Sequence, residues 1–159
     1  MQTSRAKTPV LVRPAAPGDL DSWLPLWNGY NAFYGREGAT ALPAAVTADR
    51  WANFLAPDVA MWSLVASLGD RLVGLANYLF HPSTTDLAPS CYLQDLFTAS
   101  EHRGAGVGAA LIEGVAARAR LAGSTSLYWQ THHTNATAMR LYDRVAARSE
   151  FVIYQRPLG

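Results

Sequence analysis

The sequence predicts a single domain of the α/β (α+β) class over residues 1–159, in which helices flank one mixed sheet. Strand-like and helix-like segments alternate along most of the chain, and no internal repeat or linker interrupts them. A chain of 159 residues fits one domain with a sizeable core. Half of the residues are hydrophobic, and only 16% are charged. We expect residues 1–8 to form a loose N-terminus.

The first predicted elements are a strand and an amphipathic helix. Residues 9–13 form an apolar run that reads as a strand. From residue 20 to 34, apolar and aromatic side chains recur at three- and four-residue steps, which indicates a helix with one buried face. Asp19 or Asp21 can cap this helix, and Pro25 predicts that it begins late or kinks.

A second helix and a hairpin follow. Thr47 is the predicted N-cap of a helix that runs to residue 55 and stops before Pro57. Residues 61–68 and 71–80 read as two strands. Gly69-Asp70 between them is typical of a tight hairpin turn.

The second half of the chain alternates strands and helices after a polar loop at 82–89. The predicted strands are residues 91–98, 127–130 and 150–155, and the predicted helices are 107–121 and a segment capped by Thr134 or Asn135 that ends near residue 145.

The junction before the helix at 107–121 is rich in glycine. Alternate glycines leave backbone N–H groups open to close approach, because no Cβ blocks them. A helix N-terminus adds about half a positive charge, and such a junction suits a phosphate or pyrophosphate. An arginine at the start of the junction adds a planar guanidinium group that is permanently charged. The run consists of Arg103, Gly104, Ala105, Gly106, Val107 and Gly108.

Three interpretations of this run compete. A P-loop needs Lys and then Ser or Thr after its last glycine, but Ala109 follows Gly108. A dinucleotide-binding fingerprint needs an acidic residue after the next strand, but that strand leads into Thr131-His132-His133, which include no acidic residue. The third interpretation is a flexible connection without a ligand.

Two motifs carry a resemblance to a known family. Arg-x-x-Gly-x-Gly follows a strand and precedes an Ala-rich helix, and Asn135-Ala136-Thr137-Ala138-Met139-Arg140-Leu141-Tyr142 follows a short aromatic strand. This arrangement resembles the GCN5-related N-acetyltransferases, most densely over residues 92–142. The resemblance implies a mostly antiparallel sheet that splays between its fourth and fifth strands, where the pantetheine arm of the donor, acetyl-coenzyme A, enters.

The resemblance also implies where the coenzyme binds. The glycine run is similar to the family's pyrophosphate loop, and the helix from Asn135 is similar to its second cofactor-side helix. The coenzyme-binding residues implied in this way are Leu96, Phe97, Thr98, Arg103, Gly104, Ala105, Gly106, Val107, Gly108, Asn135, Met139 and Tyr142.

Acetyl transfer from a thioester to an amine needs a base, a stabilised oxyanion and a proton for the leaving thiolate. The resemblance implies that Tyr142 donates this proton, although its spacing also fits an ordinary core tyrosine. It also implies an irregular strand near residues 96–98, where a bulge frees backbone N–H groups to stabilise the oxyanion.

The general base is the open part of the predicted mechanism. Similar diamine acetyltransferases have Tyr-Leu-Glu-Asp in this strand and their Glu is implicated in deprotonation, but here the position is Gln94, which cannot accept a proton. We predict that Asp95 is the base, although a regular strand would point it away from the Gln94 face. The alternatives are a water chain polarised by Gln94, or one of His81, His132 and His133.

The acceptor is predicted to lie against the first helix and the loop after it. Aromatic faces attract an ammonium and a carboxylate pairs with it. Residues 80–83 and 91–97 are most similar to acetyltransferases of small amines (diamines, polyamines and amino acids). The alternatives are a protein lysine or N-terminal acetyltransferase and a non-catalytic acyl-coenzyme A-binding protein. The predicted substrate-binding residues are Tyr30, Phe33, Tyr34 and Glu37.

Composition argues against several other classes. The formal net charge of +1, without a basic run, gives no footprint for nucleic acid. No stretch approaches 18 apolar residues, and the single cysteine, Cys91, fits a reducing compartment, so we expect a cytoplasmic protein that does not bind a membrane. A lone strand cysteine is more typical of apolar packing than of a covalent acetyl carrier. We expect no metal site, and the resemblance implies a homodimer.

Overall fold

The computed structural model describes residues 8–159, so the expected loose N-terminus lies outside the described residues for positions 1–7. The strands are β1 (Val10–Pro14), β2 (Met61–Leu68), β3 (Arg71–His81), β4 (Ser90–Thr98) and β5 (Ser126–Tyr128). The helices are α1 (Leu20–Phe33), α2 (Ala44–Leu55), α3 (Val107–Leu121) and α4 (Ala136–Val145).

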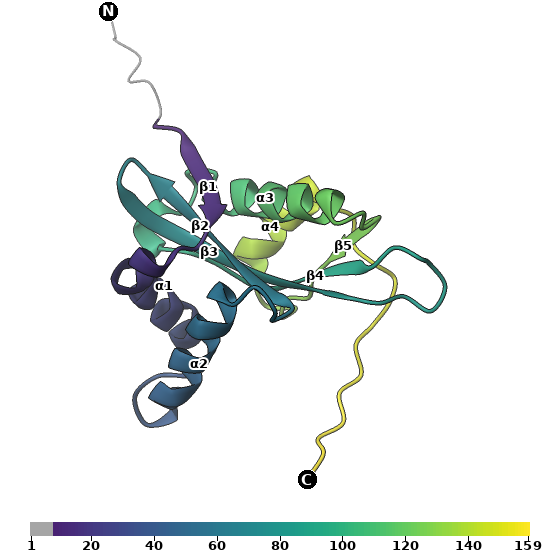
Figure 1. Cartoon of the computed structure of the whole chain (residues 1–159), viewed down its shortest axis with the longest axis horizontal. Helices are drawn as coiled ribbons and strands as arrows, with labels where there is room; N and C mark the ends of the chain where they lie inside the picture. The colour runs from purple at the N-terminus through teal and green to yellow at the C-terminus, as the bar shows by residue number, and fades with distance from the viewer. Residues whose placement is uncertain (1–7) are drawn as a thin grey trace, which may run out of the picture.

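The strands form one mixed sheet in the order β1-β2-β3-β4-β5. The first three pairings are antiparallel and the β4–β5 pairing is parallel. Helices α1 and α2 cover one face, and α3 with α4 beside it covers the other (Figure 1). The predicted α+β class and the mostly antiparallel sheet are confirmed.

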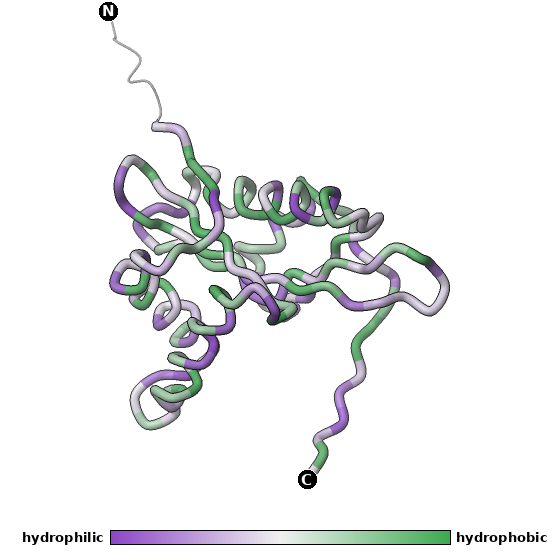
Figure 2. The backbone as a smooth tube through the Cα atoms, in the orientation of Figure 1, coloured by the Kyte–Doolittle hydropathy of each residue, from purple (hydrophilic) through white to green (hydrophobic). Residues whose placement is uncertain are grey.

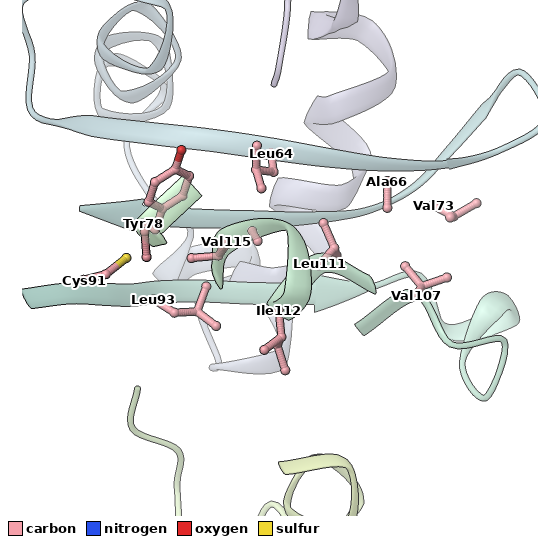
Figure 3. Close-up of a cluster of buried hydrophobic side chains, with 12 residues drawn as sticks. Leu64, Ala66, Val73, Tyr78, Cys91, Leu93, Val107, Leu111, Ile112 and Val115 are labelled. Carbon is pink, nitrogen blue, oxygen red and sulfur yellow. The ribbon is translucent and has the colours of Figure 1, made fainter. Parts of the chain in front are cut away.

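Alternation along the strands divides the core between the two faces. In β2, Leu64 and Ala66 pack toward α3, whereas Val65 packs toward α1. The α3 side is mostly aliphatic, with Leu111 and Val115 fully buried against the sheet (Figure 3). These faces bury the apolar stripes that the sequence periodicity predicts.

The α1 side of the core is built from tryptophan. Trp23 is fully buried; its ring centroid lies 5.4 Å from that of Trp27 and 4.7 Å from that of Trp51 on α2. This packing joins α1 and α2 to the sheet. It also explains why α1 begins at Leu20 and continues through Pro25 rather than beginning late, since burial of the tryptophan face compensates for the missing N–H of proline.

The predicted N-cap of the second helix is wrong. Helix α2 begins at Ala44, so Thr47 lies inside it and Pro43 takes the cap position. The Thr47 hydroxyl instead accepts a hydrogen bond from the Trp27 indole at 3.2 Å. A tertiary contact, invisible in the local sequence, therefore uses the side chain that resembled a cap.

The predicted final strand at residues 150–155 is also wrong. After α4 the chain runs away from the sheet without a strand assignment (Figure 1). Phe151 is 94% exposed and Tyr154 93%, and hydrophobic stretches are visible along this segment in Figure 2. The residues have a strand-like pattern, but no described strand lies beside them to accept their backbone hydrogen bonds.

Leu111→Ala should lower the free energy of unfolding by about 2–5 kcal/mol, because it opens a cavity between α3 and the sheet. Leu121→Ala is the matched control, since Leu121 lies on the same helix and is 80% exposed; its effect should stay within about 0.5 kcal/mol. Urea denaturation measures both. Equal losses would contradict the described burial of α3.

Candidate active site

An extra residue in β4 changes the direction of its side chains. Asn77 of β3 lies opposite Asp95, but the next residue, Tyr78, lies opposite Leu93. Gln94 therefore has no partner on β3, as in a β-bulge. This is the irregularity that would turn Asp95 away from the direction expected of a regular strand.

The bulge places Asp95 on the α1 side of the sheet. Leu93 packs in the α3 core but Phe97 packs in the α1 core, although residues four apart share a face in a regular strand. Asp95, two residues before Phe97, lies close enough to Tyr30 of α1 for each group to act on the pKa of the other. Gln94 is exposed.

The environment of Asp95 favours its protonated form. Burial raises its pKa above the usual range, while hydrogen bonds from Tyr30 and Asn77 and the charge of Arg36 act in the opposite direction. A carboxylate with a raised pKa is closer to the range in which a base can take and release a proton at neutral pH.

Asn77 can support both protonation states of this carboxyl group. Its Nδ2 donates to Asp95 Oδ2 at 2.9 Å. Its Oδ1 is buried without a hydrogen-bond partner in the described part of the chain. Because a buried carbonyl without a donor is costly, rotation of the amide toward a protonated Asp95 would satisfy that oxygen.

Tyrosines of β4 and of α1 and its end lie near Asp95, and Tyr142 of α4 lies near one of them, Tyr34. Burial raises the pKa of Tyr92 on β4, with smaller contributions from Tyr128, Asp95 and Tyr34 at the end of α1. Burial, and then Tyr34, raise the pKa of Tyr142 on α4 to about 12. The Tyr142 phenol therefore keeps its proton at neutral pH and can donate it.

The sheet opens beside this cluster. β5 pairs with β4 only through residues 90–92 of β4 and 126–128 of β5. The edge of β4 that faces β5 therefore has no strand partner from Leu93 onward among the described residues. This opening corresponds to the splay expected from the family resemblance, and it leaves backbone groups of residues 96–98 available to a ligand.

The glycine run leads directly into α3. Gly104 and Gly106 have φ values of 78° and 88°, in the left-handed region that favours glycine. Within residues 8–159, the N–H groups of residues 104, 106, 107, 108 and 109 donate to no acceptor. Arg103 is exposed beside them. The junction thus has the donors and the dipole of an anion site.

Gly108 has a different role from the other two glycines. A Cβ at this position would lie 2.8 Å from Leu141 Cδ2 of α4. The missing side chain therefore lets α4 approach the first turn of α3. This close approach was not part of the sequence prediction, which assigned all three glycines to the anion.

Helix α4 carries the remaining predicted coenzyme residues. Asn135 is its N-cap and accepts from the Ala138 N–H at 3.4 Å. Met139 is half-buried, and Tyr142 lies one helical turn further on, with its ring centroid 5.4 Å from that of Trp129. The arrangement points Tyr142 into the cluster with Tyr34.

The predicted acceptor residues differ in their placement. Tyr30 is buried beside Asp95, and Tyr34 packs edge-on against it with ring centroids 5.1 Å apart. Phe33 is 53% exposed and contacts the edge of Tyr34. Glu37 is exposed, and none of its described hydrogen bonds reaches Asp95 or the tyrosines.

The structure adds three residues that sequence reasoning did not select, namely Asn77, Tyr92 and Arg36. No sequence signal identified Asn77 or Arg36, because their role depends on which strand or helix end lies next to Asp95. Tyr92 lies in the run 91–97 that resembles the small-amine acetyltransferases, but only the bulge shows that it shares a face of the sheet with Asp95.

The alternative catalytic groups lie in other settings. Burial raises the pKa of Cys91 to about 11, which disfavours the thiolate that a covalent route needs. His81 Nε2 is 2.7 Å from the Tyr128 hydroxyl, whereas His132 and His133 are exposed. In the described residues, no group of three His, Cys, Asp or Glu side chains could hold a metal ion.

Comparisons with known proteins agree with this geometry. Residues 23–146 match the model of the acetyltransferase (GNAT) family. The chain is 34% identical over 150 residues to the D-amino-acid N-acetyltransferase HPA3 of Saccharomyces cerevisiae, covering 92% of this chain and 90% of that protein.

Solved structures share the fold. The aminoglycoside acetyltransferase AAC(6')-Iy, in complex with a coenzyme A bisubstrate analogue, has a TM-score of 0.79 at 18% identity, covering 95% of this chain and 99% of that one. The ribosomal-protein-alanine N-acetyltransferase of Brucella melitensis biovar Abortus 2308 has a TM-score of 0.75 at 21% identity, covering 94% and 100%. The chain therefore belongs to the acetyltransferase (GNAT) family, as an acetyl-coenzyme A-dependent N-acetyltransferase.

Proposed function

We propose that the protein transfers the acetyl group of acetyl-coenzyme A to the primary amine of a small molecule, and that the acceptor is an amino acid. The observation that carries this proposal is the buried carboxyl group of Asp95 among Tyr30, Tyr34 and Tyr92. The similarity to HPA3, a D-amino-acid N-acetyltransferase, supports the acceptor class.

In the proposed mechanism the donor binds along the opening between β4 and β5. The N–H groups of residues 104 and 106–109, which donate to no acceptor within residues 8–159, bind its diphosphate together with Arg103. Backbone N–H groups of Leu96, Phe97 and Thr98 on the edge of β4 that faces β5 stabilise the oxyanion that forms on the thioester carbonyl. Asn135 and Met139 line the coenzyme on the α4 side.

The acceptor amine is activated on the opposite side of β4. Its ammonium binds among the tyrosine faces, and Asp95 takes its proton, directly or through a water that Gln94 also contacts. The neutral amine attacks the thioester carbon, the C–S bond of the tetrahedral intermediate breaks, and the nitrogen of the new amide loses its second proton to solvent. Tyr142 donates its proton to that sulfur, so that no charged thiolate is released.

Two further parts of the proposal concern the protein as a whole. No helix within residues 8–159 is long and apolar enough to span a membrane. We propose a cytoplasmic location because the single cysteine of the chain fits a reducing compartment.

We also propose a homodimer. The exposed apolar segment at 150–155 and the outer edge of β5, unpaired among the described residues, are complementary, and two copies can exchange them reciprocally.

Release of thiol from acetyl-coenzyme A tests the activity, with panels of amino acids, simple amines and peptides as acceptors. Amino acids should be turned over, and Tyr142→Phe should lower kcat about 10²- to 10⁴-fold with little change in coenzyme affinity. Tyr154→Phe is the control, because Tyr154 is 93% exposed. Turnover of peptides alone would favour a protein acetyltransferase, and saturable coenzyme binding without any turnover would favour a non-catalytic binder.

Asp95→Asn should abolish most activity yet stabilise the fold at high pH. Because the pKa of Asp95 is raised in the folded state, folding is penalised above that pKa, and the penalty disappears as pH falls below the unfolded value of about 3.9. The variant should therefore gain more thermal stability at pH 8 than at pH 4. An equal gain at both pH values would show that the carboxylate is not destabilised by burial.

Light scattering tests the dimer. The full chain should have the mass of two copies, and a chain that ends at Ser149 should have the mass of one. The truncation leaves α4 and the described core intact, so its circular dichroism should keep the helical signal. If the full chain and the truncated chain were both monomers, or both dimers, the exchange of this segment would be refuted.

A further inference from the structure

Arg36 is a partly buried cation at the edge of the acceptor site that the proposed mechanism does not use. It lies in the loop after α1, and its position is fixed by two bonds to Asn31. Its backbone N–H donates to the Asn31 carbonyl at 2.9 Å, and its Nε donates to Asn31 Oδ1 at 2.7 Å. Asn31 is itself buried and donates to the Trp27 carbonyl at 2.9 Å. The guanidinium is therefore held in place from the rigid end of α1.

The other side of the guanidinium is covered by tyrosine rings. Its Cζ lies 5.4 Å from the ring centroid of Tyr34 and 5.7 Å from that of Tyr30. Such stacking favours a planar guanidinium and fixes the plane in which its N–H groups point.

Arg36 has no carboxylate partner in the described part of the chain. The described ion pairs engage other arginines: Arg13, Arg50, Arg71, Arg120 and Arg148. The Nη1 and Nη2 atoms of Arg36 donate to no acceptor within residues 8–159. A partly desolvated guanidinium with two free terminal nitrogens is suited to bind an anion in a bidentate manner.

The free cation and the buried acid share their neighbours. Tyr30 and Asp95 act on each other's pKa, and the ring of Tyr30 lies under the Arg36 guanidinium. The charge of Arg36 acts on Asp95, Tyr30 and Tyr34. The carboxyl group of Asp95 and the guanidinium of Arg36 thus lie on two sides of the same tyrosine rings. An amino acid carries its ammonium and its carboxylate on a single carbon, so its two charges match this pair.

We propose that Arg36 binds the α-carboxylate of an amino acid acceptor through Nη1 and Nη2, and thereby directs the α-amino group toward Asp95. This assignment rests on the proposed function and specifies its substrate class. It makes Arg36 a specificity-determining residue, because a polyamine or simple amine lacks the carboxylate and would place a cation near the guanidinium.

The test compares acceptors that differ only in the carboxylate. Alanine, alaninamide and ethylamine are assayed by thiol release, with both enantiomers of the first two. The proteins are the full-length wild type, Arg36→Gln and Arg36→Lys. The control is Arg140→Gln, since Arg140 is exposed on α4 and its described side-chain hydrogen bond goes to Thr137 at 3.4 Å.

Arg36→Gln should raise the KM for alanine about 10- to 100-fold, as expected for the loss of a charge-assisted contact. Its kcat at saturation and its constants for alaninamide should change little. Arg36→Lys should fall between the wild type and Arg36→Gln, because it keeps the charge and loses the fork. Equal losses for alanine and alaninamide, or no change for alanine, would overturn the assignment.

A binding experiment separates this assignment from the proposed function. N-acetylalanine should raise the Tm of the wild type, and N-acetylalaninamide should not; Arg36→Gln should lose that difference. If the wild type turned over no amino acid but N-acetylalanine still bound through Arg36, only the proposed reaction would fail. If N-acetylalanine and its amide bound equally, the carboxylate site would be refuted even in an active enzyme. Thermal melts without ligand show that each variant is folded.

Discussion

One additional residue in β4 is the feature on which the site depends. Up to Leu93 the strand sends alternate apolar side chains into the α3 core, and beyond Gln94 the phase is reversed. Without that reversal, the carboxyl group of Asp95 would enter the aliphatic core, where a charge is very costly. With it, the carboxyl group meets the hydroxyl of Tyr30 and the amide of Asn77. The edge of β4 that faces β5 has no strand partner among the described residues from Leu93 onward, so the proposed base and the proposed oxyanion donors lie next to each other in the chain.

The site is destabilising and the cores on each side of it compensate. Within residues 8–159, the partly buried Asp95 has a raised pKa, the Asn77 amide oxygen has no hydrogen-bond partner and the Arg36 guanidinium has no carboxylate partner, and each of these favours ligand binding over folding. The tryptophan packing of α1 and α2 and the aliphatic packing under α3 hold these groups at fixed positions. The proposed acceptor wall is therefore held in place by side chains that take no part in the proposed chemistry.

Much of this arrangement could be predicted from the sequence, because periodicity reports burial. The β2–β3 hairpin, α3 and α4, and the left-handed glycines before α3 all follow from local patterns. The rest depends on contacts between distant segments. Thr47 resembles an N-cap in the sequence, but its hydroxyl accepts a hydrogen bond from the distant Trp27 indole. Residues 150–155 have the pattern of a strand, but no described strand lies beside them. The bulge leaves no compositional trace, and therefore neither the orientation of Asp95 nor the role of Arg36 could be read in advance.

The contact between Gly108 and Leu141 has a consequence for the length of the donor. It sets how far the N-terminus of α3 stands from the phenol of Tyr142, one residue after Leu141 on α4. In the proposed mechanism these two points lie at opposite ends of the pantetheine chain, because the N-terminus of α3 binds the diphosphate and Tyr142 lies beside the sulfur. The spacing of α3 and α4, which depends on the absence of a Cβ at Gly108, therefore sets the distance between the two ends of the coenzyme in this proposal.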